Sequence, residues 1–177
     1  MNDVAYIGEI CRFYVMLVLL AAAAGKLRNI RAFQNALETL TGVSRKWSGG
    51  ATLSLITAEG LVGLLLLFGG ETARIGMMAA AALFLAFLGV ISLALTRRSA
   101  AVCNCFGSSP HTVSGVDLLR SIGLLTACAI YLVQFGDMND IASIDLVAIF
   151  GIAMIAALLS IHMHDIKFLL HRTKTIE

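Results

Sequence analysis

Residues 73–96, which read ARIGMMAAAALFLAFLGVISLALT, decide the fold class. No charged residue stands between Arg74 and Arg97, and an apolar stretch of about 20 residues is long enough to cross a bilayer as a helix. Backbone polar groups in lipid must hydrogen-bond within their own segment, which makes a helix the expected conformation. The stretch therefore predicts a transmembrane helix.

Four further apolar stretches surround this one, at about residues 7–24, 51–68, 116–135 and 141–161. The sequence is 59% hydrophobic and only 14% charged, with a mean hydropathy of +0.89, whereas soluble domains are roughly 25% charged. This composition excludes a soluble globular domain, a disordered chain and a disulfide-stapled secreted module. We predict one integral membrane domain over residues 1–177, an all-α polytopic helix bundle with a four-helix core and a fifth, C-terminal span.

Residues 27–41 differ from the spans in pattern. Leu27, Ile30, Phe33, Leu37 and Leu40 recur at helical spacing, with polar and charged residues between them. This pattern predicts an amphipathic helix that lies on the membrane surface or folds back into the bundle. In the next span, the pair Gly60 and Gly63 indicates a close contact with another helix, because small residues let backbones approach.

Basic residues are concentrated on one predicted side of the membrane. That side holds Lys26, Arg28, Arg31, Arg45, Lys46, Arg97, Arg98, Lys167, Arg172 and Lys174. The other side holds Arg12 and Arg74, together with Asp137 and Asp140. By the positive-inside rule, the basic side should face the cytoplasm. The net charge of +2 is too small to indicate a nucleic-acid partner.

The connection at residues 103–111, CNCFGSSPH, holds two of the four cysteines and the only proline. Cys103 and Cys105 are separated by one residue, so a disulfide between them would be strained, and strained disulfides exchange readily. Phe106, Gly107 and Pro110 would shape a tight loop around the pair. The functional interpretation is a redox-active dithiol. Two unpaired loop cysteines, or half of a metal site, are the alternatives.

Three charged residues are predicted to lie near this loop. Glu59 lies inside an apolar span, where an ionised group costs several kcal/mol, about 2.5–3.5 on insertion scales, and therefore needs a partner. Lys26 ends the first span at the edge that carries the loop, and Arg120 lies one turn inside the fourth. A nearby cation also stabilises a thiolate. A plain Glu59–Lys26 or Glu59–Arg120 pair that fixes helix packing is the structural alternative.

The other cysteines and two histidines near the C-terminal end are further candidates for a redox or metal site. Cys11 and Cys128 lie toward the opposite edge; they could form a second redox pair, but buried structural cysteines are the usual case. His162 and His164 could suggest a metal site, yet they sit in a charged tail without a fixed ligand geometry. We therefore expect no metal site.

The chain resembles the MauE family of DoxX-like membrane proteins. The residues that carry the resemblance are the first span closing at Lys26, the in-span Glu59, and the string from Cys103 to Gly107 before a span bearing Arg120. It covers roughly residues 8–135. MauE proteins are implicated in maturing methylamine dehydrogenase, whose small subunit is rich in disulfides, together with a thioredoxin-like partner, MauD. The resemblance implies a DoxX-like core, a redox pair at Cys103 and Cys105, and supporting roles for Lys26, Glu59 and Arg120.

The resulting hypothesis is a membrane thiol–disulfide oxidoreductase of the bacterial cytoplasmic membrane. It would exchange electrons with a MauD-like partner in the maturation of a disulfide-containing client protein. Quinone-linked thiol oxidases have a similar architecture, which makes a membrane quinone a candidate electron carrier. Alternatives are a non-catalytic scaffold for a thioredoxin-like factor and a small metal-handling or transport protein. The family role places the dithiol in the oxidising compartment, whereas the charge count places it in the cytoplasm.

Overall fold

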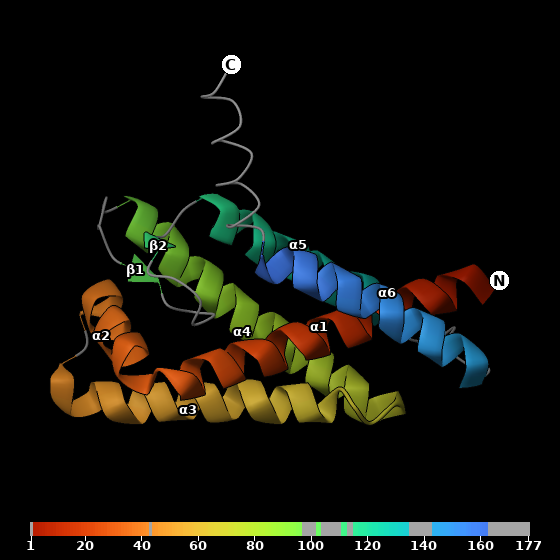
Figure 1. The fold of residues 1–177 in the computed structure, drawn as a ribbon, viewed down its shortest axis with the longest axis horizontal. Helices are drawn as coiled ribbons and strands as arrows, with labels where there is room; N and C mark the ends of the chain where they lie inside the picture. Colours follow the sequence, from red (N-terminus) through yellow and green to blue (C-terminus); the bar gives the residue numbers. More distant parts are fainter. Residues whose placement is uncertain are drawn as a thin grey trace, which may run out of the picture.

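The chain folds into a bundle of helices with a small two-stranded ladder near one end (Figure 1). The structure, a computed structural model, describes residues 2–42, 44–96, 102–103, 111–112, 115–134 and 143–162. The elements are α1 (Asn2–Arg28), α2 (Ile30–Thr41), α3 (Arg45–Leu65), α4 (Gly70–Thr96), β1 (Val102–Cys103), β2 (His111–Thr112), α5 (Gly115–Gln134) and α6 (Ser143–Ile161). The predicted all-α architecture is confirmed.

Four of the described helices are long and apolar enough to cross a membrane. They are Tyr6–Arg28, Arg45–Leu65, Gly70–Leu93 and Gly115–Gln134. The predicted fifth span corresponds to α6, whose described apolar part, Leu146–Ile161, is shorter. Large apolar side chains such as Leu61, Leu85 and Val147 are exposed on the outside of the bundle, which suits contact with lipid. The chain is a multi-pass membrane protein.

The helix ends differ by several residues from the apolar stretches in the sequence. α1 continues to Arg28, and α2 begins only at Ile30 because the side chain of Asn29 caps it, accepting a hydrogen bond from the backbone N–H of Ala32 at 3.4 Å. α3 begins at Arg45, well before residue 51. The reason is that hydropathy marks only the apolar, membrane-embedded length of a helix, whereas its backbone hydrogen bonds continue into the flanking polar residues.

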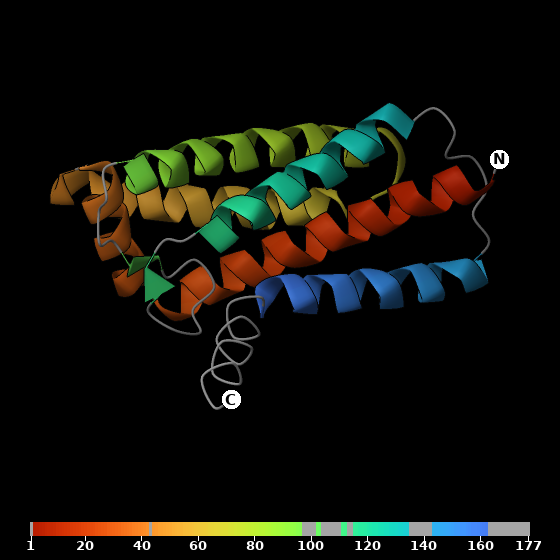
Figure 2. The same ribbon diagram turned by 90° about the horizontal axis from the view of Figure 1, so that it is seen from above.

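α1 is the central helix of the bundle and packs against α3, α5 and α6 (Figure 2). Half of the residues in its apolar segment are buried inside the bundle, compared with a third or less in the apolar segments of α3, α4 and α5. Val15, Val18 and Leu19 are almost completely buried. Polar side chains on α1 are therefore placed to meet neighbouring helices and not lipid.

α3 approaches α1 closely at one glycine. A Cβ atom added at Gly63 would lie only 2.8 Å from Cδ2 of Leu20, whereas one added at Gly60 would meet nothing within 4 Å. Of the two glycines predicted to serve a close helix contact, Gly63 makes it with α1.

α2 folds back against the first turns of α3, one of the two placements predicted for the amphipathic helix. Nε2 of Gln34 donates to Oγ of Ser48 at 2.8 Å, and this Oγ donates to Oε1 of Glu38 at 2.6 Å. The hydrogen bonds fix α2 on α3 while Phe33 and Ala36 are buried.

The two ends of the bundle differ. α2 and the β1–β2 ladder gather at one end, hereafter the α2 end, and the N-terminus lies at the other (Figure 1). At the α2 end, α3 extends past the end of α1, and α4 diverges from α3. The space between these helices is the setting of the candidate site.

Candidate functional site

A buried ion pair links α1 to α3 near the α2 end. Nζ of Lys26 donates to Oε1 of Glu59. Lys26 is 2% exposed and Glu59 is 8% exposed. Because α3 extends past α1, the middle of α3 comes level with the last turn of α1, which explains how a residue well inside α3 meets one at the end of α1. Of the two partners considered for Glu59, the structure selects Lys26.

The two members of this pair differ in their further contacts. Lys26 has a second contact, because its Nζ lies 5.1 Å from the ring centroid of Phe33 on α2, within reach of a cation–π interaction. Oε2 of Glu59 is buried and has no hydrogen-bond partner among the described residues. An unsatisfied buried oxygen of a carboxylate costs free energy, so this atom is a candidate acceptor for a group that the described residues do not supply.

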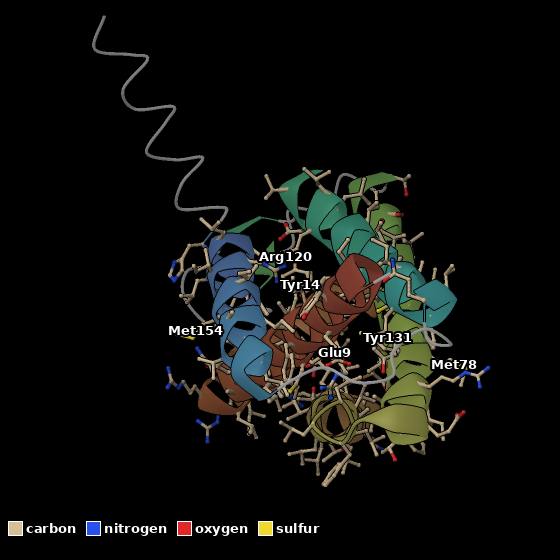
Figure 3. All side chains as sticks on the ribbon, turned by 90° about the vertical axis from the view of Figure 1, so that its right-hand side faces the viewer. Glu9, Tyr14, Met78, Arg120, Tyr131 and Met154 are labelled. Carbon is tan, nitrogen blue, oxygen red and sulfur yellow. The ribbon has the colours of Figure 1, made fainter. Side chains whose placement is uncertain are left out.

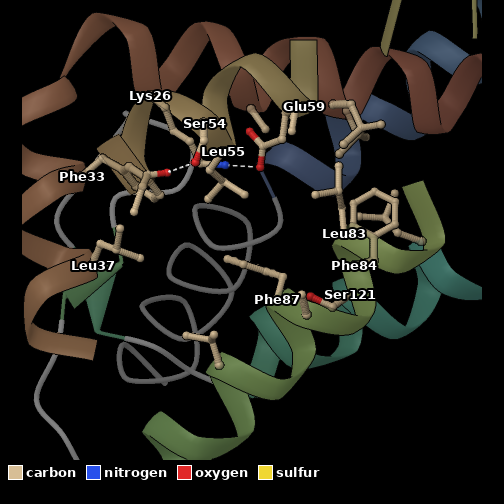
Figure 4. A pocket seen from close by; sticks show the side chains of 18 of the residues that line it. Lys26, Phe33, Leu37, Ser54, Leu55, Glu59, Leu83, Phe84, Phe87 and Ser121 are labelled. Carbon is tan, nitrogen blue, oxygen red and sulfur yellow. Dashed lines mark hydrogen bonds and ion pairs between the residues drawn. The ribbon is translucent and has the colours of Figure 1, made fainter. Parts of the chain in front are cut away.

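The ion pair lines a cavity of about 520 Å³. Its described walls come from α1 to α5 and are mostly apolar; Figure 4 shows Lys26 and Glu59 facing one another on one side and aromatic residues of α4 on the other. The described lining residues are Val18, Leu19, Ala22, Lys26, Phe33, Ala36, Leu37, Ala51, Ser54, Leu55, Ala58, Glu59, Leu83, Phe84, Ala86, Phe87, Val90, Arg120, Ser121 and Leu124. Small-molecule sites typically combine such an apolar wall with a few polar groups and measure roughly 300–1,000 Å³.

Among the described residues, the wall of the cavity reaches the outside of the bundle between α3 and α4. Ser54 on α3 and Ala86 on α4 both line it and are exposed. Their neighbours Leu53 and Leu85 are each 58% exposed on the same helices. Because these helices are membrane spans, the opening faces an apolar surface, and a ligand could enter from lipid.

Arg120 lines the same cavity from α5. Its Nη1 donates to the backbone carbonyl of Ser160 on α6 at 3.5 Å, and Oη of Tyr14 donates to Oγ of Ser160 at 3.1 Å. Figure 3 shows Arg120 and Tyr14 close together between the helices. Sequence reasoning missed Tyr14 and Ser160. The sequence does carry a signal for them, a polar side chain inside an apolar span, but the prediction considered only the charged residues in the spans.

The structure describes part of the predicted dithiol loop. β1 pairs antiparallel with β2, with Val102 opposite Thr112 and Cys103 opposite His111. β1 also contacts α2, which forms one wall of the cavity. The backbone of Cys103 therefore lies at the same end as Lys26 and Glu59. The other predicted loop residues, Cys105, Phe106, Gly107 and Pro110, lie outside the described residues.

A second polar cluster lies at the opposite end of α1. Nε of Arg12 donates to Oε2 of Glu9 at 2.8 Å, and its Nη1 donates to the carbonyl of Leu66 at 2.7 Å. Arg12 is only 6% exposed. It satisfies a carbonyl at the end of α3. Its charge therefore stabilises the inside of the bundle and does not indicate which side of the membrane this end faces.

The remaining cysteines are unpaired. Cys11 is half-buried and Cys128 is fully buried, and both are free thiols. His162 follows the last turn of α6, and His164 lies outside the described residues. Within the described ranges, no three His, Cys, Asp or Glu residues gather as a metal site would need.

The α2 end brings several chemically distinct features together. It combines a cysteine backbone beside α2, an apolar cavity, and three charged groups on the cavity wall, of which Lys26 and Glu59 are buried and Arg120 is half-buried. Buried ionisable groups in membrane spans commonly mark functional sites.

A family model described as methylamine utilisation protein MauE matches residues 4–134 of the chain. The match covers α1 to α5, including every helix that lines the cavity, and ends before α6. No curated protein and no solved structure matches the chain.

Proposed function

The chain belongs to the methylamine utilisation MauE family, and from this premise we propose that it is a membrane thiol–disulfide redox protein. Cys103 and Cys105 form its redox pair, and its partner is a thioredoxin-like protein. The single observation that carries the proposal is the contact of β1 with α2, which supports a position of Cys103 beside a cavity with buried charges. The client is a disulfide-containing enzyme subunit, such as that of methylamine dehydrogenase.

The exchange conserves electrons at each step. One loop thiolate attacks a disulfide of the partner, forming a mixed disulfide and releasing one partner thiol. The second loop cysteine then attacks the mixed disulfide. The partner leaves as a dithiol, and the loop pair becomes the disulfide. The reverse sequence oxidises the partner, and the relative reduction potentials set the direction.

Cys103 is the better candidate for the attacking thiol. In the β1–β2 register, the backbone of Cys103 pairs with that of His111, which supports a histidine in the neighbourhood of this cysteine. A protonated histidine near a cysteine stabilises the thiolate, which is the nucleophile. Cys105 then acts as the resolving cysteine.

Serine substitution tests the proposal directly. We expect Cys103→Ser and Cys105→Ser each to abolish maturation of the client enzyme, measured as its activity and disulfide content in cells. Cys11→Ser and Cys128→Ser serve as matched controls and should leave maturation intact, since these cysteines lie toward the other end of α1 and α5.

Full maturation with the Cys103→Ser, Cys105→Ser double variant would overturn the redox role. If the double variant also still co-purified with the thioredoxin-like partner, the protein would be a non-catalytic anchor for that partner.

A further inference from the structure

We propose that the cavity at the α2 end binds the ring of a membrane quinone in its reduced, quinol form, with a quinol hydroxyl donating to Oε2 of Glu59. The inference rests on the proposed function, because it names the lipid-soluble electron carrier with which the dithiol exchanges electrons. It assigns Glu59, Lys26 and the apolar walls of the cavity to this ligand.

The first support is the hydrogen-bonding state of Glu59. Its Oε1 is occupied by Lys26, while its buried Oε2 has no partner in the described part of the protein. Glu59 is 8% exposed and lines the cavity. The missing partner must be a hydrogen-bond donor, because an ionised carboxylate oxygen only accepts. A hydroxyl group on a bound ligand satisfies this requirement.

The second support is the character of the cavity. Its volume of about 520 Å³ and its aliphatic and aromatic walls suit a substituted ring, and Phe33, Phe84 and Phe87 provide aromatic surfaces. The exposed lining positions Ser54 and Ala86 leave it open between two membrane spans. These features suit a ligand that combines a polar ring with an apolar tail, as a quinone with an isoprenoid chain does.

The chemistry of such a carrier matches that of a dithiol. Closing the loop disulfide releases two electrons and two protons, and a quinone takes up both to become a quinol. The reverse reaction reduces the disulfide and regenerates the quinone. Arg120, on the cavity wall contributed by α5, adds a second positive charge to the lining of the cavity.

Binding to the purified full-length protein tests the inference without any turnover. The probes are decylubiquinone and its reduced form, decylubiquinol, titrated in lipid nanodiscs under anaerobic conditions. n-Decanol, which shares the alkyl tail but lacks the ring, is the control for a plain acyl-chain site. We expect saturable binding of the quinol, weaker binding of the quinone, and no saturable binding of n-decanol.

Glu59→Gln is the decisive variant. With Oε1 still held by Lys26, the new amide N–H₂ group replaces Oε2, so a donor stands where an acceptor stood. We expect quinol affinity to fall about tenfold, in line with the loss of one buried hydrogen bond, while quinone affinity stays the same or rises. Glu71→Gln, on an exposed pair with Arg74, is the matched control and should change neither affinity.

A second variant keeps the test valid if Glu59→Gln does not fold. Ala58→Phe fills the cavity from α3 without removing either member of the ion pair, and it should abolish binding of both probes. Equal binding of n-decanol and decylubiquinol would overturn the inference, since the cavity would then take any acyl chain. Unchanged quinol preference in Glu59→Gln would overturn it as well.

The same titration on the Cys103→Ser, Cys105→Ser variant separates this inference from the proposed function. Quinol binding by that variant supports the cavity assignment independently of the dithiol. If the wild-type dithiol exchanges with its partner but no probe binds, the cavity assignment is wrong and the proposed function stands.

Discussion

At the residue scale, the buried pair of Lys26 and Glu59 organises the α2 end. Removing two charges from water is costly, and a buried pair recovers that cost only through close contact and further hydrogen bonds. This pair is close, but it leaves Oε2 of Glu59 without a hydrogen-bond partner among the residues that the structure describes. Such an incomplete arrangement is more typical of a binding site than of a purely structural contact.

Replacing only one residue of this ion pair should strongly destabilise the protein. Lys26→Met leaves an uncompensated buried carboxylate, and we expect it to lower the free energy of unfolding by about 3–5 kcal/mol. The double variant Lys26→Met, Glu59→Leu should recover most of this loss. Thermal unfolding in detergent measures both.

The exposed pair of Glu71 and Arg74 provides the control for this comparison. Its side chains are 71% and 49% exposed, and exposed ion pairs contribute about 0–1 kcal/mol. Equal effects of Arg74→Met and Lys26→Met would show that burial adds nothing to the Lys26–Glu59 pair.

His111 gives a second prediction at this scale. If it stabilises the Cys103 thiolate, His111→Gln should slow alkylation of Cys103 several-fold at neutral pH. The rate is measured by stopped-flow alkylation in a chain whose other cysteines are serine. His162→Gln, at the end of α6, is the matched control. An unchanged rate in His111→Gln would remove the reason for assigning the attack to Cys103.

The charged site residues could be predicted from sequence because ionisable groups are conspicuous in apolar spans. Lys26, Glu59 and Arg120 line one cavity, as their common end of the bundle suggested. The contribution of α2 could not be predicted, since a single amphipathic pattern fits both a surface helix and one folded into the bundle. The interhelical roles of Tyr14 and Ser160 could not be predicted either, because an uncharged polar side chain can also hydrogen-bond within its own helix.

At the element scale, the contact between α1 and α3 holds the ion pair together. At Gly63 it is close enough that a Cβ atom added there would require the side chain of Leu20 to move. Four of the five apolar stretches correspond to helices long and apolar enough to cross a membrane, and the fifth corresponds to the shorter apolar part of α6. Which faces of these helices are in contact could not be predicted from hydropathy.

Gly63→Ala should therefore weaken the bundle. The added Cβ would lie 2.8 Å from Cδ2 of Leu20, and overpacking of this kind typically costs about 1–3 kcal/mol. Gly60→Ala is the matched control one helical turn away, where a Cβ meets nothing within 4 Å, and it should be neutral or slightly stabilising. Thermal unfolding in nanodiscs would compare the two, and equal losses would contradict the packing.

At the scale of the whole molecule, the exposed charges bear on which way the bundle faces. At the α2 end, Lys26 is buried in its ion pair, whereas Arg28, Arg31, Arg45 and Lys46 are exposed. At the other end, Arg12 is buried against Glu9 and the carbonyl of Leu66. Removing the two buried cations from the count leaves the asymmetry intact.

The positive-inside rule then predicts that the α2 end faces the cytoplasm. A membrane-impermeant maleimide applied to intact spheroplasts should not label Cys103 or Cys105, and it should label them after permeabilisation. Labelling from outside would contradict the charge rule. It would also place the dithiol in the oxidising compartment, which is the side expected for a direct role in disulfide maturation.

The central claim is that Cys103 and Cys105 cycle between dithiol and disulfide, and their redox state in living cells tests it most directly. Cells that express the chain with Cys11→Ser and Cys128→Ser are quenched with acid and treated with a thiol-reactive mass label. The account predicts two populations, carrying two labels or none, whose ratio shifts when the thioredoxin-like partner is deleted. A pair that stays in one state with and without the partner would contradict it.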